Sequence, residues 1–382
     1  MCYKPKTNAI LEAFFLNPGI KIPLPPGFDA QDERFQRAFA VLRQAVDQHA
    51  FPGASVAVTD HGRLVALKGL GRFTYDPEST AVSSDTIYDL ASVTKVVATT
   101  ALCMVLHERG AIHLDQPFAE LLPEFAGHDP RRRQVTLRMV LAHSSGLPAY
   151  VRLFESARTR EDLIAKALEV PLEADPGSRA EYSDIGFILL GVALERLLRN
   201  SLDELCRQQV FSRLGLTSLR FKPPEDWKAL IPPTVRDLTF RNRAVQGEVH
   251  DENAWVMGGV AGHAGCFGTA HDVALFAECM LRGGAPLVSR ETVATFTLRE
   301  PTPAGTSRAL GWDTPSQPSQ SGQYLSPRSF GHLGYTGTSL WIDPERQLSV
   351  TLLTNRTWPD RGSQLIKKIR PAFHDAVIEA LD

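Results

Sequence analysis

The chain has 382 residues, of which 43% are hydrophobic and 22% are charged, and its formal net charge is −2. These values are typical of a globular protein with a sizeable core, and the length corresponds to two to three domains. They argue against nucleic-acid binding, because the run of three arginines at 131–133 is too short to follow a phosphate backbone.

The amino-terminal residues 1–27 are expected to form an extension outside the fold. Their apolar stretch at 9–16 is short, is interrupted by Glu12 and is not followed by a cleavage site of small residues, so a secretory signal is not expected. No apolar run elsewhere is long enough to cross a bilayer. The five cysteines form an odd set without C-x-x-C spacing, which fits a reducing compartment. We therefore expect a cytoplasmic protein that binds no membrane, with Cys103 and Cys279 as buried thiols.

Both ends of the chain carry strand patterns, and the middle carries helical ones. Alternating apolar residues predict strands near the two ends, and spacing of three and four residues predicts helices. The expected elements are a helix from Asp29, strands at 54–58 and 64–68, a helix at 270–282 capped by Thr269, strands at 330–335, 338–342 and 348–354, and a helix at 364–381.

This order predicts a two-lobed fold of the α/β (α+β) class. Strands from the two ends must pair across whatever lies between them, so we expect one antiparallel sheet built from both termini and covered by the terminal helices. Residues 28–84 and 285–382 should form this α/β domain, and residues 85–284 should form an inserted, mainly helical domain. Clefts form where two such lobes meet.

The segment Asp89-Leu-Ala-Ser-Val-Thr-Lys places a serine and a lysine three residues apart in apolar surroundings. On a helix, Ser92 and Lys95 would point the same way, and a neutral lysine could activate the hydroxyl as a nucleophile. Near pH 7 this requires the lysine pKa to fall by about three units from about 10.4, which an apolar helix and neighbouring positive charge could supply. The alternative is structural: Ser92 caps the helix and Lys95 extends to water.

Two further stretches favour catalysis. Tyr182 precedes a helix that Ser183 or Asp184 would cap, and His332 lies on a glycine-rich strand where a ligand can approach the backbone.

Together these motifs resemble the serine β-lactamase and penicillin-binding-protein superfamily, in its class C-like branch of β-lactamase-like esterases and D-stereospecific peptidases. Ser92-Val-Thr-Lys95, Tyr182-Ser-Asp184 and His332-Leu-Gly334 occur in family order, over a likeness that spans about residues 51–354.

The resemblance implies roles for the matching residues. Ser92 would be the acylated nucleophile, and Lys95 and Tyr182 would share the proton transfers. His332 would help to bind and polarise the substrate beside Gly334, and the amides of Ser92 and Tyr335 would form the oxyanion hole. The fold that it implies is a β-lactamase/transpeptidase-like one, with the site between the lobes.

Two positions depart from the family pattern. Asp184 stands where asparagine is usual, and an ionised carboxylate can only accept a hydrogen bond; it could instead be a helix cap. His332 and Leu333 stand where class C β-lactamases have lysine and threonine, and a histidine near neutral pH is often uncharged. Both departures argue against an efficient β-lactamase.

Other candidates receive structural interpretations. His143 and His263 should fix loops by hydrogen bonding, and the glycine-rich run 258–265 could either lie over the cleft or form a tight backbone crossing. No metal or nucleotide motif occurs, so no cofactor and no metal ion are expected.

The sequence thus predicts a serine hydrolase with an acyl-enzyme intermediate, most simply a carboxylesterase that acts on small esters. The alternatives are a D,D-peptidase, a D-aminopeptidase or a weak β-lactamase on a small amide substrate, and a catalytically silent binding protein on the same scaffold. An acyltransferase remains open, because water and another acceptor would use the same residues. The oligomeric state is not predicted.

Overall fold

A computed structural model describes residues 22–382 of the chain. Most of the expected extension 1–27, and with it Cys2 and the stretch at 9–16, lies outside the described residues. Cys103 and Cys279 are buried, as predicted. Within the described residues, no helix is both long and apolar enough to cross a membrane.

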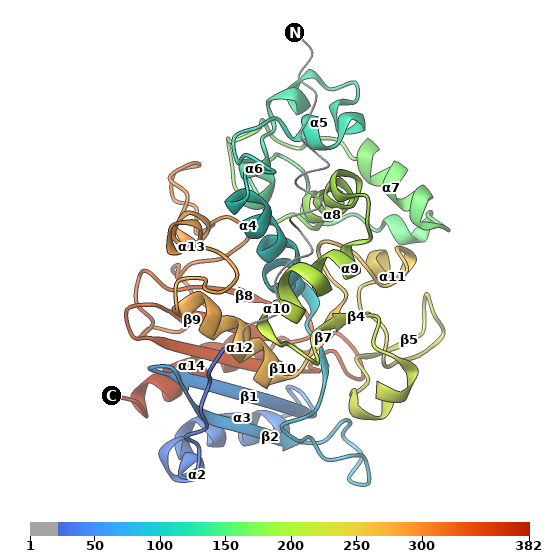
Figure 1. Ribbon diagram of the computed structural model, residues 1–382. Coiled ribbons are helices and arrows are strands. Elements are labelled where there is room, and N and C mark those ends of the chain that lie inside the picture. The colour runs from blue at the N-terminus through green and yellow to red at the C-terminus, as the bar shows by residue number, and fades with distance from the viewer. Residues whose placement is uncertain (1–21) are drawn as a thin grey trace.

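A five-stranded antiparallel sheet joins the two ends of the chain, as predicted. Its strand order is β2-β1-β10-β9-β8 (Figure 1). The central pair places Ala54 of β1 opposite Thr354 of β10 and Asp60 opposite Leu348. The strands are β1 (Gly53–Asp60), β2 (Arg63–Gly71), β8 (Phe330–Leu333), β9 (Ser339–Asp343) and β10 (Leu348–Thr354).

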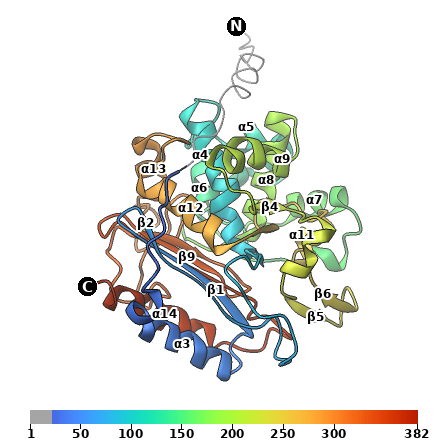
Figure 2. The same ribbon diagram turned by 60° about the horizontal axis from the view of Figure 1, so that its bottom comes forward.

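Terminal helices cover one face of this sheet, because both faces of its strands are apolar. Helices α3 (Gln36–Asp47) and α14 (Ile366–Glu379) lie side by side there (Figure 2), after the short α2 (Gln31–Arg34). Phe39 and Phe373 from these helices pack in one buried cluster with Val56, Val350 and Trp341 of the sheet.

The opposite face of the sheet is covered by α12 (Ala270–Leu281), which contacts β1, β9 and β10. Thr269 caps this helix, as predicted, by accepting a hydrogen bond from the Asp272 amide. We assigned the range 85–284, which includes this helix, to the helical domain. The packing of α12 places it with the sheet instead. Conversely, α13 (Arg290–Thr297) contacts α4 (Ala101–Glu108) of the helical lobe, although it lies within the range 285–382.

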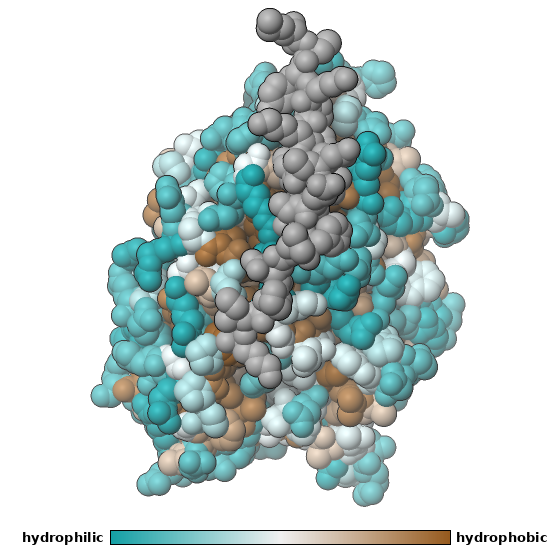
Figure 3. Space-filling model, in the orientation of Figure 1, coloured by the Kyte–Doolittle hydropathy of each residue, from teal (hydrophilic) through white to brown (hydrophobic). Residues whose placement is uncertain are grey.

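The helical lobe surrounds a central segment that is continuously buried from Val93 to Leu106. On the face seen in Figure 3, hydrophobic residues are interspersed among hydrophilic ones, as on an ordinary protein surface. Its further elements are α5 (Phe118–Leu121), α6 (Leu137–Leu141), α7 (Arg160–Glu169), α8 (Asp184–Leu198), α9 (Leu202–Cys206), α10 (Ser212–Leu214) and α11 (Glu252–Val256), with β3 (Tyr88–Asp89), β4 (Arg220–Phe221), β7 (Cys266–Gly268), β5 (Val235–Asp237) and β6 (Arg243–Val245).

Candidate active site

Ser92 lies in a strained turn at the junction of the two lobes. A 3₁₀ turn, Ala91–Val93, leads from β3 into a π-helix, Lys95–Thr100, that continues as α4. Ala91 has a φ of 45°, in the left-handed region that is unfavourable for a residue with a side chain. The carboxylate of Asp89 supports this turn by accepting a hydrogen bond from the Ala91 amide at 2.8 Å.

Lys95 is fully buried directly beneath Ser92. Its Nζ donates hydrogen bonds to Ser92 Oγ at 3.1 Å, to Asp184 Oδ1 at 2.6 Å and to the carbonyl oxygen of His263 at 3.0 Å. The structural alternative, in which this lysine extends to water, is therefore wrong. These three acceptors match the three N–H donors of the ammonium group, so the buried charge is fully hydrogen-bonded.

The protonation state of Lys95 differs from our expectation. Burial, the largest single effect, lowers its pKa, but the adjacent Asp184 carboxylate and the Tyr182 side chain together outweigh burial, and the net shift is upward from the ordinary value. The predicted fall of about three units is thus corrected, since the apolar helix is only part of the environment. Lys95 is therefore held as an ammonium ion.

Asp184 is the first residue of α8, and Ser183 rather than Asp184 caps that helix. The Ser183 hydroxyl accepts a hydrogen bond from the Gly186 amide at 3.1 Å. The capping role considered for Asp184 is therefore wrong, because its carboxylate faces Lys95 instead.

Tyr182 lies beside this ion pair. Its ring centroid is 4.8 Å from Lys95 Nζ, and its hydroxyl is buried although part of the ring is exposed to the cleft. Burial raises the pKa of Tyr182 to about 12, against the lowering effect of the Lys95 charge and with a further rise from Asp184. The phenol therefore carries its proton at neutral pH and can donate it.

His332 extends from β8 toward the tyrosine, with its ring centroid 5.9 Å from that of Tyr182. Its Nδ1 lies 2.8 Å from the carbonyl oxygen of Leu333. Because a carbonyl can only accept, Nδ1 carries the proton and Nε2 offers a lone pair. Burial, then the positive charges of Lys95 and Arg308, hold the pKa of His332 well below its ordinary value. This residue is neutral and supplies no positive charge to a substrate.

The turn after β8 is hydrogen-bonded to the segment that leads into Ser92. The Thr336 hydroxyl donates to the carbonyl oxygen of Asp89 at 2.9 Å, and the Thr338 hydroxyl donates to that of Leu90 at 3.2 Å. A side chain at Gly334 would collide with Thr338 and would lie 2.8 Å from the Leu90 oxygen, so only glycine fits. Tyr335, the next residue, lines the same cleft as Ser92. Its role and that of the Ser92 amide in an oxyanion hole stay predictions.

The predicted residues converge on one cleft of about 610 Å³ between the two lobes. Lys95 does not line the cleft but contacts Ser92 and Asp184 from below. The predicted residues that line it are Ser92, Tyr182, Asp184, His332, Gly334 and Tyr335.

The two loop histidines act as expected. His143 Nδ1 accepts a hydrogen bond from the Ser183 amide at 3.0 Å, and His263 Nε2 donates to Asp251 Oδ1 at 2.8 Å. The glycine-rich run 258–265 combines both interpretations: Gly262 passes against Gly191 of α8, where a side chain would collide with backbone, while His263 lines the cleft.

Several cleft residues were not foreseen from the sequence. The Cζ atom of Arg308 lies 5.4 Å from the centroid of the Tyr182 ring, and its Nη1 lies 3.6 Å from Asp313 Oδ1. No motif spacing marks these residues, because most of them lie in loops: Arg308 and Asp313 precede β8, and Arg356 and Arg361 lie between β10 and α14. The others that line the cleft include Tyr150, His250, Arg356, Arg361 and Arg370. Within residues 22–382, no group of three or more His, Cys, Asp or Glu side chains is arranged to hold a metal ion.

The sequence matches a known family over most of its length. The family model described as Beta-lactamase matches residues 38–370. A protein of Salmonella agona (strain SL483) named "Putative D-alanyl-D-alanine carboxypeptidase" is 32% identical over 372 residues, which cover 86% of this chain and 84% of that protein. A Salmonella typhi protein of the same name matches over the same extent.

Solved structures share the fold at lower identity. EstCE1, described as a hydrolase with promiscuous acyltransferase activity, superposes with a TM-score of 0.74 at 22% identity, covering 91% of this chain and 100% of that one. A class C beta lactamase from Rhodobacter sphaeroides gives a TM-score of 0.71 at 22% identity with the same coverage.

Proposed function

The chain belongs to the beta-lactamase family of serine hydrolases, and we propose that it is a carboxylesterase that hydrolyses small acyl esters through an acyl-enzyme on Ser92. The observation that carries this proposal is the contact between Ser92 Oγ and Lys95 Nζ at 3.1 Å at the floor of the cleft. A serine hydroxyl needs such a neighbour to become a nucleophile.

Acylation begins when Ser92 Oγ attacks the ester carbonyl carbon. Because Lys95 is an ammonium ion, it accepts the hydroxyl proton as it passes one of its own protons to Asp184, 2.6 Å away. The oxyanion that forms receives hydrogen bonds from the amides of Ser92 and Tyr335, each of which is worth roughly 10²- to 10³-fold in rate at such a site.

The alcohol leaves with a proton from Tyr182. The C–O bond to the alcohol breaks, Tyr182 protonates the departing oxygen, and the Asp184 proton returns through Lys95 to restore the phenol. Ser92 is then esterified, and the free alcohol is the first product. Water then attacks the carbonyl carbon of the acyl-enzyme, and its proton passes through Tyr182 and Lys95 to Asp184. The proton returns through Lys95 to Ser92 Oγ as the carboxylic acid leaves.

The protonation states favour esters over amides. Lys95 and Tyr182 both hold their protons at neutral pH, so the free enzyme contains no strong base beside Ser92. An ester is a more reactive acyl donor than an amide and has a better leaving group. Neutral His332 also supplies no charge at the position where class C β-lactamases have a lysine.

The test compares hydrolysis of p-nitrophenyl acetate and butyrate by the wild type and by Ser92→Ala. We expect the variant to lose turnover while its thermal unfolding stays unchanged. Equal rates for the two proteins would refute the proposal, and an absence of turnover by the folded wild type on every ester would favour a silent binding protein.

A second candidate is a D-alanyl carboxypeptidase, which the name of the Salmonella relatives at 32% identity favours. It would use the same acyl-enzyme with D-alanine as the leaving group. Release of D-alanine from a peptide that ends in D-alanyl-D-alanine, faster than ester hydrolysis and lost in Ser92→Ala, would favour it over the esterase.

A further inference from the structure

A second group of polar side chains lines the cleft and takes no part in the chemistry above. It consists of His250, Arg356 and Arg361. His250 precedes α11, and the two arginines lie between β10 and α14, so the group draws on both lobes.

His250 is buried, yet its side chain is unpaired. Both ring nitrogens lack a hydrogen-bond partner among residues 22–382, and the side chain lines the cleft. Burial, then the positive charge of Arg361, hold the pKa of His250 well below its ordinary value. The ring is therefore neutral, with one donor and one acceptor. An unpaired buried polar group is unfavourable, so a ligand that pairs with this ring is bound more tightly.

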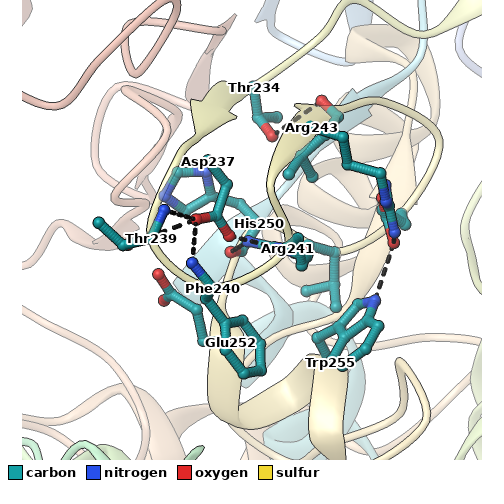
Figure 4. A network of polar contacts seen from close by, with 12 residues as sticks. Thr234, Asp237, Thr239, Phe240, Arg241, Arg243, His250, Glu252 and Trp255 are labelled. Carbon is teal, nitrogen blue, oxygen red and sulfur yellow. Dashed lines mark hydrogen bonds and ion pairs between the residues drawn. The ribbon is translucent and has the colours of Figure 1, made fainter. Parts of the chain in front are cut away.

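The backbone of His250 is held firmly by its neighbours. Its amide donates to Asp89 Oδ2 at 2.6 Å, and its carbonyl oxygen accepts from Arg241 Nη2 at 2.8 Å. Arg241 also donates to the carbonyl oxygen of Val249 and forms a buried ion pair with Asp237 at 2.8 Å (Figure 4). The network fixes the loop through its main chain and leaves the imidazole free for a ligand.

Arg356 is a buried cation without a carboxylate partner among the described residues. Its Nε donates to the carbonyl oxygen of Tyr335 at 2.7 Å, and its Nη1 donates to those of Arg361 and Ser363. The guanidinium lies 4.3 Å from the centroid of the Tyr335 ring, which in turn lies 5.8 Å from that of His250.

Arg361 contributes a second donor. Its Nη2 forms an ion pair with Glu252 at 2.6 Å, but its Nε is buried without a partner in the described part of the chain. Arg370 is hydrogen-bonded to the turn after β8 and donates only to neutral oxygens, including the Gly334 carbonyl. The three arginines on this wall, Arg356, Arg361 and Arg370, therefore outnumber its two carboxylates, Asp251 and Glu252.

We propose that His250, Arg356 and Arg361 form a subsite for a carboxylate carried by the substrate, so that the enzyme prefers esters that bear a second, free carboxylate to neutral esters of the same length. The inference rests on the proposed esterase function and specifies its substrate class. The ring of Tyr335 covers one face of Arg356, which supplies positive charge, and the donors without a partner in the described residues are the Nε–H of Arg361 and one imidazole N–H of His250. This small set suits the two oxygens of a carboxylate.

The kinetic test compares mono-p-nitrophenyl succinate with p-nitrophenyl butyrate, which has the same acyl chain length without the charge. The wild type should have a higher kcat/KM for the succinate ester, through a lower KM. In His250→Phe and Arg361→Gln, the ratio of the two kcat/KM values should fall by about ten- to a hundredfold, as expected for a lost hydrogen bond to a charged group. Lys222→Gln, which removes an exposed cation outside the cleft, is the matched control and should keep the wild-type ratio.

A binding measurement makes the test independent of turnover. Calorimetric titration with glutarate should detect binding to the wild type and Lys222→Gln, and weaker or no binding to Arg361→Gln. Hydrolysis of the neutral ester without a preference for the charged one, together with no glutarate binding, would overturn the subsite and leave the esterase intact. Absence of hydrolysis of both esters would overturn the esterase, and the titration would still decide the subsite.

Discussion

Replacement of Asp184 by asparagine removes the charge opposite Lys95 while the side chain keeps its size. The Lys95 side chain is 0% exposed and the Asp184 side chain is 15% exposed, with 2.6 Å between Nζ and Oδ1. Loss of one partner from such a pair costs about 3–5 kcal/mol, because the other charge stays buried. We expect about 3 kcal/mol at pH 7, since the asparagine oxygen still accepts a hydrogen bond.

The loss should depend on pH. In the wild type the pKa of Lys95 is raised, so its stabilising contribution is fully present, and constant, at all pH values below the ordinary lysine pKa. In the variant, burial is unopposed by Asp184 and lowers the pKa of Lys95. The folded variant then binds fewer protons than its unfolded chain, and its stability rises with pH by at most about 1.4 kcal/mol per unit. Between pH 7 and 9 the difference in stability should therefore shrink by up to about 2.7 kcal/mol.

Urea denaturation followed by tryptophan fluorescence at pH 7 and 9 measures this difference. Asp203→Asn is the matched control, because Asp203 faces the exposed Lys222 at 3.6 Å and should contribute less than about 1 kcal/mol at both pH values. A destabilisation of Asp184→Asn below that of the control, or one that is equal at pH 7 and 9, would refute the reasoning.

Three further substitutions test other parts of the site. Tyr182→Phe should slow the hydrolysis of alkyl esters by about 10²- to 10⁴-fold and that of p-nitrophenyl esters by less, because only a poor leaving group needs the phenol proton. Equal losses of rate on the two kinds of ester would contradict this role. Gly334→Ala should lower both kcat and the melting temperature, since a methyl group would collide with Thr338, and unchanged values would show that the turn has room. Burial raises the pKa of Asp89 to about 6, so the folded protein binds more protons than the unfolded chain between about pH 4 and 6. In urea denaturation, the stability of the wild type relative to Asp89→Asn should therefore fall as the pH rises from 4 to 6. Parallel pH curves for the two proteins would contradict this expectation.

The parts of the fold that the sequence predicts are those with a local pattern. The alternation in 54–58 and 348–354 identified the central strands, and Thr269 with the glycines at 283–284 bounded α12. The partner of that helix was not predictable from its own pattern, because an apolar face does not state whether a sheet or another helix covers it.

The same division applies to the site. Ser92, Lys95 and His332 belong to short motifs, so their side chains were identifiable before the fold was known. The Asp184 carboxylate that sets the charge of Lys95 is 89 positions away from it, and the contact depends on how α8 packs against the π-helix. His250 and Arg361 face the cleft from separate loops whose main-chain paths no spacing rule predicts.

The central claim is that Ser92 is an activated nucleophile, and covalent labelling tests it most directly. The folded protein is incubated with a fluorophosphonate that phosphorylates reactive serines, and the modified peptide is identified by mass spectrometry. The account predicts one label, on Ser92, and none on Ser92→Ala. Labelling of another residue, or equal labelling of both proteins, would contradict it.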